Sequence, residues 1–193
     1  MATNRRYDIE LETKAFSDGD CRNGNSMSID QDLERITLQE KRLQFKSFDS
    51  GMAWALGSAL KAAAEKRHVA VAIDIQVNGH ALFSYAMSGT TPDNWEWIRR
   101  KRNVVTRYQR SSYAIGLKHQ RSGTTLESSG LDAKDYAAHG GCFPILLEGT
   151  GCVGTITVSG LPQREDHALV VAVLQEYLHL TDEDLALDAT TPS

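Results

Sequence analysis

The sequence predicts an α+β fold, a single domain in which α-helices flank an antiparallel β-sheet. Its length of 193 residues suits one domain with a substantial core. Two segments have the alternating, turn-separated pattern of β-hairpins. The segments between and around them carry apolar residues at helical spacing. Helices that alternate with hairpins are typical of an antiparallel sheet covered by helices.

The first third of the chain predicts an arm and two helices. Residues 1–27 are polar, with Gly, Ser and Asn near the end, and predict a flexible arm. Residues 28–44 have apolar side chains at helical spacing. A second helix begins at Asp49 or Ser50, either of which could cap it, and its apolar stripe ends near Lys66.

Two hairpins follow at separate places. Residues 69–87 alternate between apolar and polar side chains around an Asn78-Gly79 dipeptide, which is a strong two-residue hairpin turn. Residues 143–147 and 152–159 read as two more strands joined by a glycine-containing turn. The four strands together predict the antiparallel sheet.

A third helix lies between the hairpins. Thr91 is a good N-cap, Pro92 suits the first helical position, and Asp93 suits the positive end of the helix dipole. This helix is expected to run to about Arg110.

The rest of the chain is assigned by composition and spacing. Residues 111–120 are ambiguous between helix and extended chain, and residues 120–134 read as a loop. Residues 164–180 predict a closing helix. The domain therefore spans residues 28–180, and residues 181–193 are expected to form a flexible acidic tail.

Composition restricts the partners. The formal net charge is −4, from 25 acidic and 21 basic residues, so no nucleic-acid partner is expected. The three cysteines, Cys21, Cys142 and Cys152, show no metal-binding spacing and are expected to be reduced. No segment is apolar enough for a membrane and the N-terminal residues lack a signal-peptide core, which predicts a cytoplasmic protein without a membrane partner.

The basic run in the third helix is divided by helix geometry. At about 100° per residue, Lys101 and Asn94 face the apolar side, and Arg100 and Arg102 lie at its flanks. Lys101 could lay its stem on the core with the ammonium in water. Alternatively it could hold an anionic ligand or a carboxylate of the protein, for which Asp74 is a candidate.

Two short stretches add candidate binding groups. Thr90 and Thr91 begin the third helix, where backbone N–H groups are exposed to an anion. His139 precedes Gly140 and Gly141, which allow close backbone approach. The histidine could be an iron ligand, a general base or a hydrogen-bonding residue at a turn.

Other motifs have plainer interpretations. Residues 149–154 match G-x-G-x-x-G, but they lie between two strands, so they indicate a hairpin turn and not a dinucleotide site. Glu165 and Asp166 begin the closing helix and are interpreted as complements of its dipole. No Ser/His/Asp triad, metal-binding spacing or phosphate-binding loop is apparent.

Several segments together resemble a known family, the uncharacterised subgroup of the haem-degrading-domain superfamily. This superfamily includes GlcG-like proteins, extracellular haem-binding HbpS proteins and the C-terminal domain of PduO cobalamin adenosyltransferases. The resemblance covers about residues 28–178. It rests on FDSGMAWALGSAL, VAIDIQVNGH, GTTPDNWEWIRRKRNVV, YAAHGGCFPI and GTGCVGTITVSGLPQREDHALVV.

The resemblance implies an antiparallel sheet flanked by helices, a ring-like homo-oligomer built from dimers, and haem as a candidate cofactor. The superfamily also includes relatives that release iron or break down haem. Asn94, Lys101 and His139 are the polar positions that match the group's motifs, and His139 is the candidate iron ligand. The segments that contact iron in the extracellular haem binders are not clearly matched here.

Three functions remain open at this point. The first is binding of haem, a corrinoid or another planar cofactor, with its propionates near Lys101, Arg100 or Arg102. The second is a cofactor-free small-molecule enzyme with His139 as acid/base and Lys101 holding an anion. The third is a non-catalytic assembly or chaperone-adaptor protein. Asn94, Thr90, Thr91, Gly140 and Gly141 complete the predicted ligand site.

Overall fold

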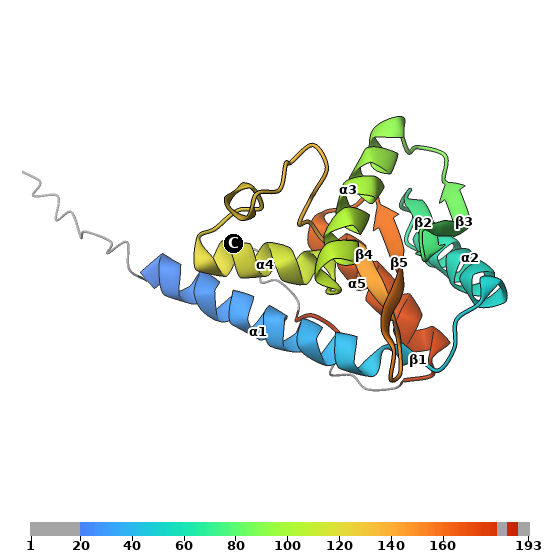
Figure 1. The fold of residues 1–193 in the computed structure, drawn as a ribbon, viewed down its shortest axis with the longest axis horizontal. Coiled ribbons are helices and arrows are strands. Elements are labelled where there is room, and N and C mark those ends of the chain that lie inside the picture. Colours follow the sequence, from blue (N-terminus) through green and yellow to red (C-terminus); the bar gives the residue numbers. More distant parts are fainter. Residues whose placement is uncertain (1–19, 181–184, 189–193) are drawn as a thin grey trace, which may run out of the picture.

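A computed structural model describes residues 20–180 and 185–188, with the side chains of the first helix described from Ser28 onward. Figure 1 labels the helices and strands, which are numbered in chain order. They are α1 (Asp20–Arg42), β1 (Gln44–Phe45), α2 (Ser50–Lys66), β2 (Ala72–Val77), β3 (His80–Ala86), α3 (Pro92–Tyr108), α4 (Ser112–Ser122), a 3-10 helix (Glu127–Ser129), β4 (Cys142–Leu147), β5 (Gly151–Ser159) and α5 (Gln163–Tyr177).

The predicted single α+β domain is confirmed, and its sheet has one strand more than expected. The strands are ordered β1-β4-β5-β2-β3. Both predicted hairpins form and β2 pairs with β5, all antiparallel. The additional strand, β1, pairs in parallel with β4, so the sheet is mixed. The predicted helix over 28–44 was too long at its end, because the helix stops at Arg42 and the chain extends to pair with β4.

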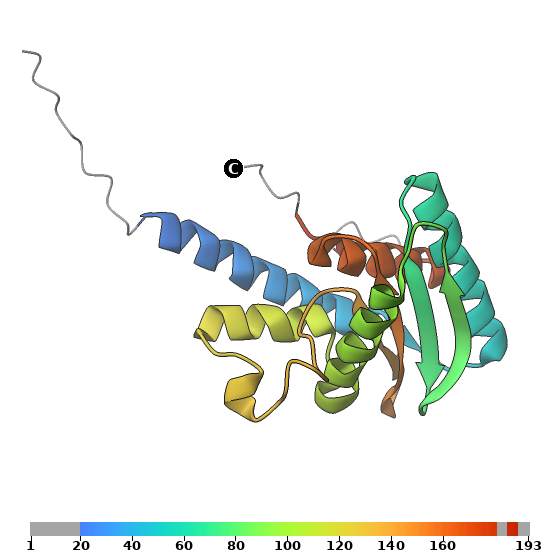
Figure 2. The same cartoon turned by 90° about the horizontal axis from the view of Figure 1, so that it is seen from above.

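The two faces of the sheet have opposite character. On one face, Ile73, Ile156 and Phe143 are fully or almost fully buried in the main core, where α2 and α5 cover them. The helix α3 crosses the other face (Figure 2), which carries buried polar side chains, including Asp74 and Thr157. Strand residues alternate between faces, so β5 contributes an apolar row to the core and a polar row, Thr155, Thr157 and Ser159, toward α3.

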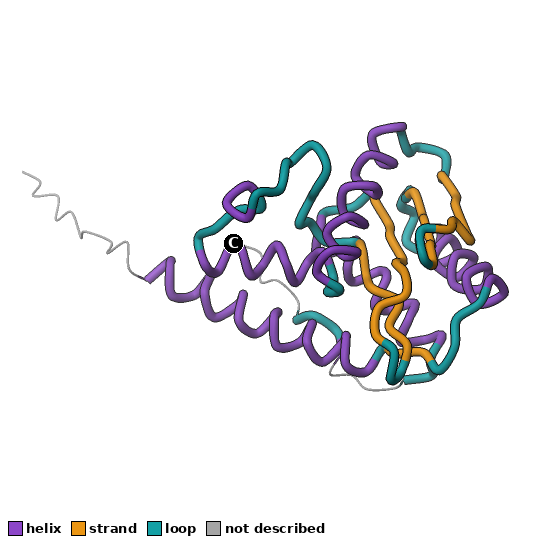
Figure 3. Tube along the Cα trace, in the orientation of Figure 1, coloured by secondary structure: helices purple, strands orange, loops and turns teal. Residues whose placement is uncertain are grey.

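The helix α4 settles the ambiguous segment at 111–120. It lies beside α1 (Figures 1 and 2), and Tyr113 and Leu117 pack there against Leu33 and Ile36. A long loop containing the 3-10 helix then leads to β4, as Figure 3 shows in teal. This loop carries His139 to the edge of α3.

Described residues on both sides of the predicted 28–180 segment also belong to or contact the folded elements. Helix α1 begins at Asp20, inside the segment expected to be a flexible arm, and residues 1–19 lie outside the described residues. Leu185, in the predicted tail, is fully buried, and its carbonyl accepts a hydrogen bond from Gln39 Nε2 at 2.6 Å. Residues 181–184 and 189–193 lie outside the described residues. Among the described helices, none is both long and apolar enough to cross a bilayer.

Candidate functional site

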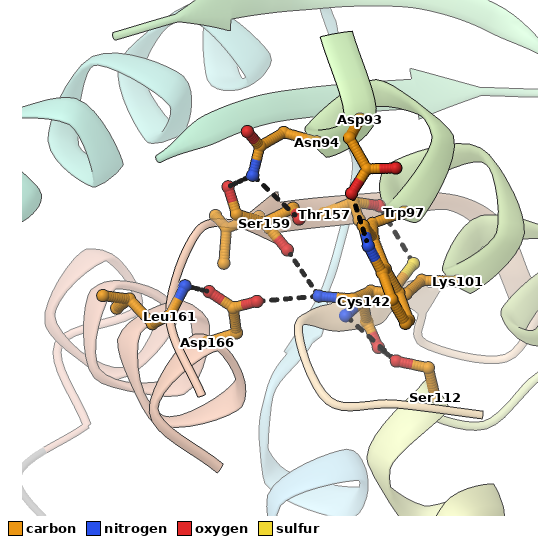
Figure 4. A network of polar contacts seen from close by, with 11 residues as sticks. Asp93, Asn94, Trp97, Lys101, Ser112, Cys142, Thr157, Ser159, Leu161 and Asp166 are labelled. Atoms are coloured by element: carbon orange, nitrogen blue, oxygen red, sulfur yellow. Dashed lines mark hydrogen bonds and ion pairs between the residues drawn. The ribbon is translucent and has the colours of Figure 1, made fainter. Parts of the chain in front are cut away.

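A polar cavity of about 290 Å³ opens where β5 ends, between the first turns of α3 and α5. Figure 4 shows most of its polar contacts. Four predicted site residues meet in this cavity although they come from two distant parts of the sequence. They are Thr91, Asn94, Lys101 and His139; the lining also includes Asp93, Trp97, Ser159, Gly160, Leu161, Gln163 and Asp166.

A buried ion pair forms the floor of the cavity. Lys101 Nζ lies 2.7 Å from Asp166 Oδ2 and donates a second hydrogen bond to the Val158 carbonyl at 3.1 Å. Both side chains are almost inaccessible, with 4% and 2% of their surface exposed. The predicted inward direction of Lys101 is confirmed, and its role toward a ligand stays a prediction.

The partner predicted for Lys101 was wrong. Asp74 lies beneath α3, but it accepts a hydrogen bond from Arg102 Nη1 at 2.9 Å. The helix turns Arg102 toward β2 and Lys101 toward the far end of β5, where α5 begins. Asp166 therefore does more than complement the helix dipole, since it balances a buried ammonium and its Oδ1 accepts the Leu161 N–H at 3.0 Å.

Burial and hydrogen bonding act on the pKa of Asp166 in opposite directions. Burial raises the pKa of Asp166, while the Lys101 ammonium and the backbone N–H groups of Leu161 and Gly160 oppose that shift. Protonation of this carboxyl would release the Lys101 ammonium from its partner.

Gly140 and Gly141 allow the close packing around this ion pair. Gly141 has φ of +117°, and a Cβ there would lie 2.7 Å from Lys101 Nζ and 2.6 Å from the Val158 carbonyl oxygen. A Cβ at Gly140 would lie 1.9 Å from the Gln163 carbonyl oxygen. Both residues are buried, so they shape the floor and wall of the cavity through their backbones.

His139 stands at the mouth of the cavity with an accessible imidazole. Its ring lies edge-to-face against Trp97, with 5.1 Å between centroids, and the Arg100 guanidinium lies 4.2 Å from the Trp97 ring centroid. Within the described part of the chain its ring nitrogens have no hydrogen-bond partner. Partial burial lowers the pKa of His139, and the charges of Lys101 and Arg100 lower it further. The imidazole is therefore neutral near pH 7.

A second, more apolar cavity of about 250 Å³ adjoins His139 on its other side. Arg100, Leu126, Tyr136 and Ala138 contribute to its lining. His139 belongs to the lining of both cavities, so it separates a polar compartment from a largely apolar one.

Asn94 and Thr90 form hydrogen bonds that join the start of α3 to neighbouring segments. The Oδ1 of Asn94 accepts the Thr91 N–H at 2.8 Å, and its Nδ2 donates to the Ser159 carbonyl at 3.2 Å, which ties the start of α3 to the end of β5. Thr91 is the N-cap of α3, as predicted. The Thr90 hydroxyl donates to the Met87 carbonyl at 2.7 Å.

One predicted site residue lies at a different cavity, and one residue of this site was not predicted. Arg102 lines a different cavity, on the side of α3 toward the hairpin tips. Trp97 was not predicted as a site residue, although its Nε1 donates to Asp93 Oδ2 at 3.0 Å and its ring contacts His139. The i, i+4 spacing of Asp93 and Trp97 was the available signal.

The described residues contain no group of three or more His, Cys, Asp or Glu side chains that could hold a metal ion. His139 alone could bind iron only within a cofactor that supplies the other ligands. Cys142 is buried below α3, and burial raises the pKa of its thiol to about 12. It is therefore a protonated, structural thiol.

Comparison with known proteins confirms the resemblance drawn from the motifs. A UPF0303 protein of Azotobacter vinelandii is 62% identical over 163 residues, which cover 84% of this chain and 98% of that protein. A UPF0303 protein of Serratia proteamaculans is 55% identical over 156 residues, covering 80% and 97%.

Solved structures show the same fold. The crystal structure of Ybr137w protein matches with 34% identity and a TM-score of 0.71, covering 76% of this chain and 87% of that one. The structures of HbpS and of a PduOC:haem complex match with 20% and 18% identity, TM-scores of 0.56 and 0.54, and coverage of 70% and 66% of this chain and 92% and 93% of theirs. Residues 48–175 match the family described as "Haem degrading protein HbpS-like". The chain belongs to this HbpS-like family.

Proposed function

We propose that this protein binds haem or a related planar, anionic cofactor, with His139 as the iron ligand. The observation that carries the proposal is the imidazole of His139, which is accessible, neutral and without a hydrogen-bond partner among the described residues. A protonated imidazole has no lone pair for a metal, so the lowered pKa favours coordination. A haem supplies four nitrogen ligands of its own, and one imidazole is then sufficient to hold its iron.

The surroundings of His139 suit the rest of such a cofactor. Trp97 offers an aromatic surface, and the adjoining cavity is largely apolar. Arg100 lies over the Trp97 ring and donates two long hydrogen bonds, both of 3.4 Å, to the carbonyls of Glu96 and Ala133. Its planar guanidinium keeps further N–H donors for a propionate and matches the geometry of a carboxylate. The description of the family names haem degradation, and one structural neighbour is a haem complex.

The small size of the cavities implies that another protein surface covers part of the bound cofactor. The cavities on either side of His139 measure about 290 and 250 Å³, which is below the usual range of roughly 300–1,000 Å³ for small-molecule sites. One chain would therefore enclose only part of a macrocycle. We propose that a second copy of the chain covers the remainder, in a homo-oligomer built from dimers in the cytoplasm.

Haem titration followed by absorbance tests the proposal. The wild-type protein should give a saturable Soret band, and His139→Ala should lose the band or shift its position. His80→Ala is the matched control, because His80 is exposed on the β2–β3 hairpin away from this site. Arg100→Ala should weaken binding and leave the band position unchanged. Identical titrations of wild type and His139→Ala would refute His139 ligation.

A second candidate is a cofactor-free enzyme, with His139 as acid/base and Lys101 as the holder of an anionic substrate. The shared lining of His139, Lys101 and Asp166 favours it. Lys101 is neutralised by Asp166, so anion binding would require this carboxyl to take up a proton, which its raised pKa assists. Proton uptake on ligand binding, measured by calorimetry in buffers of different ionisation enthalpy, distinguishes this candidate, since haem ligation by a neutral imidazole requires none.

A further inference from the structure

A third cavity, of about 320 Å³, lies on the opposite side of α3 from the ion pair, below the tips of the two hairpins. It shares no lining residue with the two cavities at His139. Its polar lining is Gln76, Asn78, Arg102, Thr106, Gln109, Cys152 and Thr155.

Thr155 lines this cavity, and its buried hydroxyl is unsatisfied. The residue is only 3% exposed, and its Oγ1 has no hydrogen-bond partner in the described part of the chain. The two residues that follow it on the same face of β5 are paired: Thr157 donates to Cys142 Sγ at 3.0 Å, and Ser159 Oγ accepts from Asn94 at 3.5 Å. Since buried hydroxyl groups are normally hydrogen-bonded, the exception at Thr155 points to a missing partner.

Arg102 lines the same cavity, and its guanidinium is fixed by an ion pair while other N–H groups stay available. Its Nη1 donates to Asp74 Oδ2, and Asp74 Oδ1 accepts from Gln76 Nε2 at 3.4 Å. A guanidinium has five N–H donors, and the hydrogen bonds described for Arg102 use one of them. Asp74 does not itself line the cavity, and among the described lining residues none is acidic. The described cavity wall therefore presents spare guanidinium N–H donors and no carboxylate, while Asp74 pairs with the guanidinium from behind.

We propose that this cavity is a second ligand site, which binds a small molecule through an oxyanion, either a carboxylate or a phosphate. The oxyanion accepts hydrogen bonds from the free N–H groups of Arg102 and from the Thr155 hydroxyl. Charge-assisted hydrogen bonds of this kind are the strong ones in proteins. The volume is at the lower limit for small-molecule sites, which restricts the ligand to a compact metabolite.

Calorimetric titration of the full chain with acetate, succinate and inorganic phosphate tests the proposal, with acetamide as the uncharged control. At least one anion should bind saturably and acetamide should not. Thr155→Val keeps the shape of the side chain and should weaken binding by roughly tenfold or more, because a hydrogen bond to a charged group is lost. Thr157→Val is the matched control on the same strand, and both it and His139→Ala should retain the wild-type affinity.

A chemical readout in the wild-type chain locates the ligand without any substitution. Cys152 lines this cavity and is only partly buried, whereas Cys142 is fully buried. The bound anion should slow alkylation of Cys152 by iodoacetamide, measured by peptide mass spectrometry. Saturation by the carboxylates alone or by phosphate alone assigns the oxyanion. The proposal is overturned if no anion saturates, if Thr155→Val binds like wild type, or if Cys152 gains no protection, and water is then the partner of Thr155.

Discussion

Removal of Lys101 should expose the energetic cost of the buried ion pair. In Lys101→Met, Asp166 keeps a carboxylate that is 2% exposed and has lost its cation. Breaking a buried pair in this way typically costs about 3–5 kcal/mol. Asp166 can instead bind a proton and become neutral. At pH 7 the free energy of this protonation is about 4 kcal/mol for a carboxyl with an ordinary pKa of about 3.9. We therefore expect a loss of about 4 kcal/mol at pH 7.

The pH dependence of this loss follows from the same reasoning. In the variant, the folded state binds a proton on Asp166 that the unfolded state releases above pH 4, so the stability of the variant rises as the pH falls. The destabilisation should shrink by about 1.4 kcal/mol for each pH unit toward pH 5. The double variant Lys101→Met/Asp166→Asn removes both charges and should recover most of the stability, because the amide oxygen can still accept the Leu161 N–H.

Urea unfolding of wild type, both single variants and the double variant, at pH 7 and at pH 5, measures these quantities. The double-mutant cycle reports the coupling between the two side chains. A coupling below about 1 kcal/mol, as for exposed ion pairs, would refute the buried pair. A loss in Lys101→Met that does not change with pH would show that Asp166 is not the group left without a partner.

Three other sets of substitutions test the residues that support the site. His167 is fully buried and its pKa is lowered to about 3, so stability should be retained above pH 6.5 and fall by about 2 kcal/mol between pH 6.5 and pH 4.5; His167→Gln should flatten this part of the urea-derived stability profile. Gly141→Ala places a Cβ against a backbone oxygen at positive φ and should prevent folding or lower the melting temperature strongly, whereas Gly149→Ala, with positive φ and no close neighbour, should cost only about 1 kcal/mol. Asn94→Ala removes the hydrogen bond from the Thr91 N–H at the start of α3 and the hydrogen bond to the Ser159 carbonyl of β5, and should cost about 1–2 kcal/mol in urea unfolding without a change in the haem band position.

Local patterns were sufficient for most of the elements. The alternation over 69–87 with Asn78-Gly79 identified the first hairpin, and Thr91 with Pro92 identified the start of α3. The segment that became α4 was ambiguous because Gly116 weakens its helical signal. A Cβ at Gly116 would lie 2.2 Å from the Ala138 carbonyl oxygen, so tertiary packing requires the residue that obscures the helix.

The strand β1 could not be predicted for a related reason. Leu43 and Phe45 continue the apolar pattern of α1, and the basic pair Lys41-Arg42 is a weak signal that the helix ends there. The partner of β1 lies about a hundred residues later, at Leu146 and Leu147. A two-residue parallel strand depends on this pairing and has no turn signal of its own.

The sequence by itself determined the α+β class, the two hairpins, the caps and the inward direction of Lys101, because each depends on periodicity or on neighbours within a few residues. Only the tertiary structure decided which carboxylate meets each cation. Lys101 reaches Asp166 and Arg102 reaches Asp74, although the sequence offered Asp74 as the candidate partner of Lys101. The choice depends on how α3 crosses the sheet and where α5 begins, and packing across the whole chain sets both.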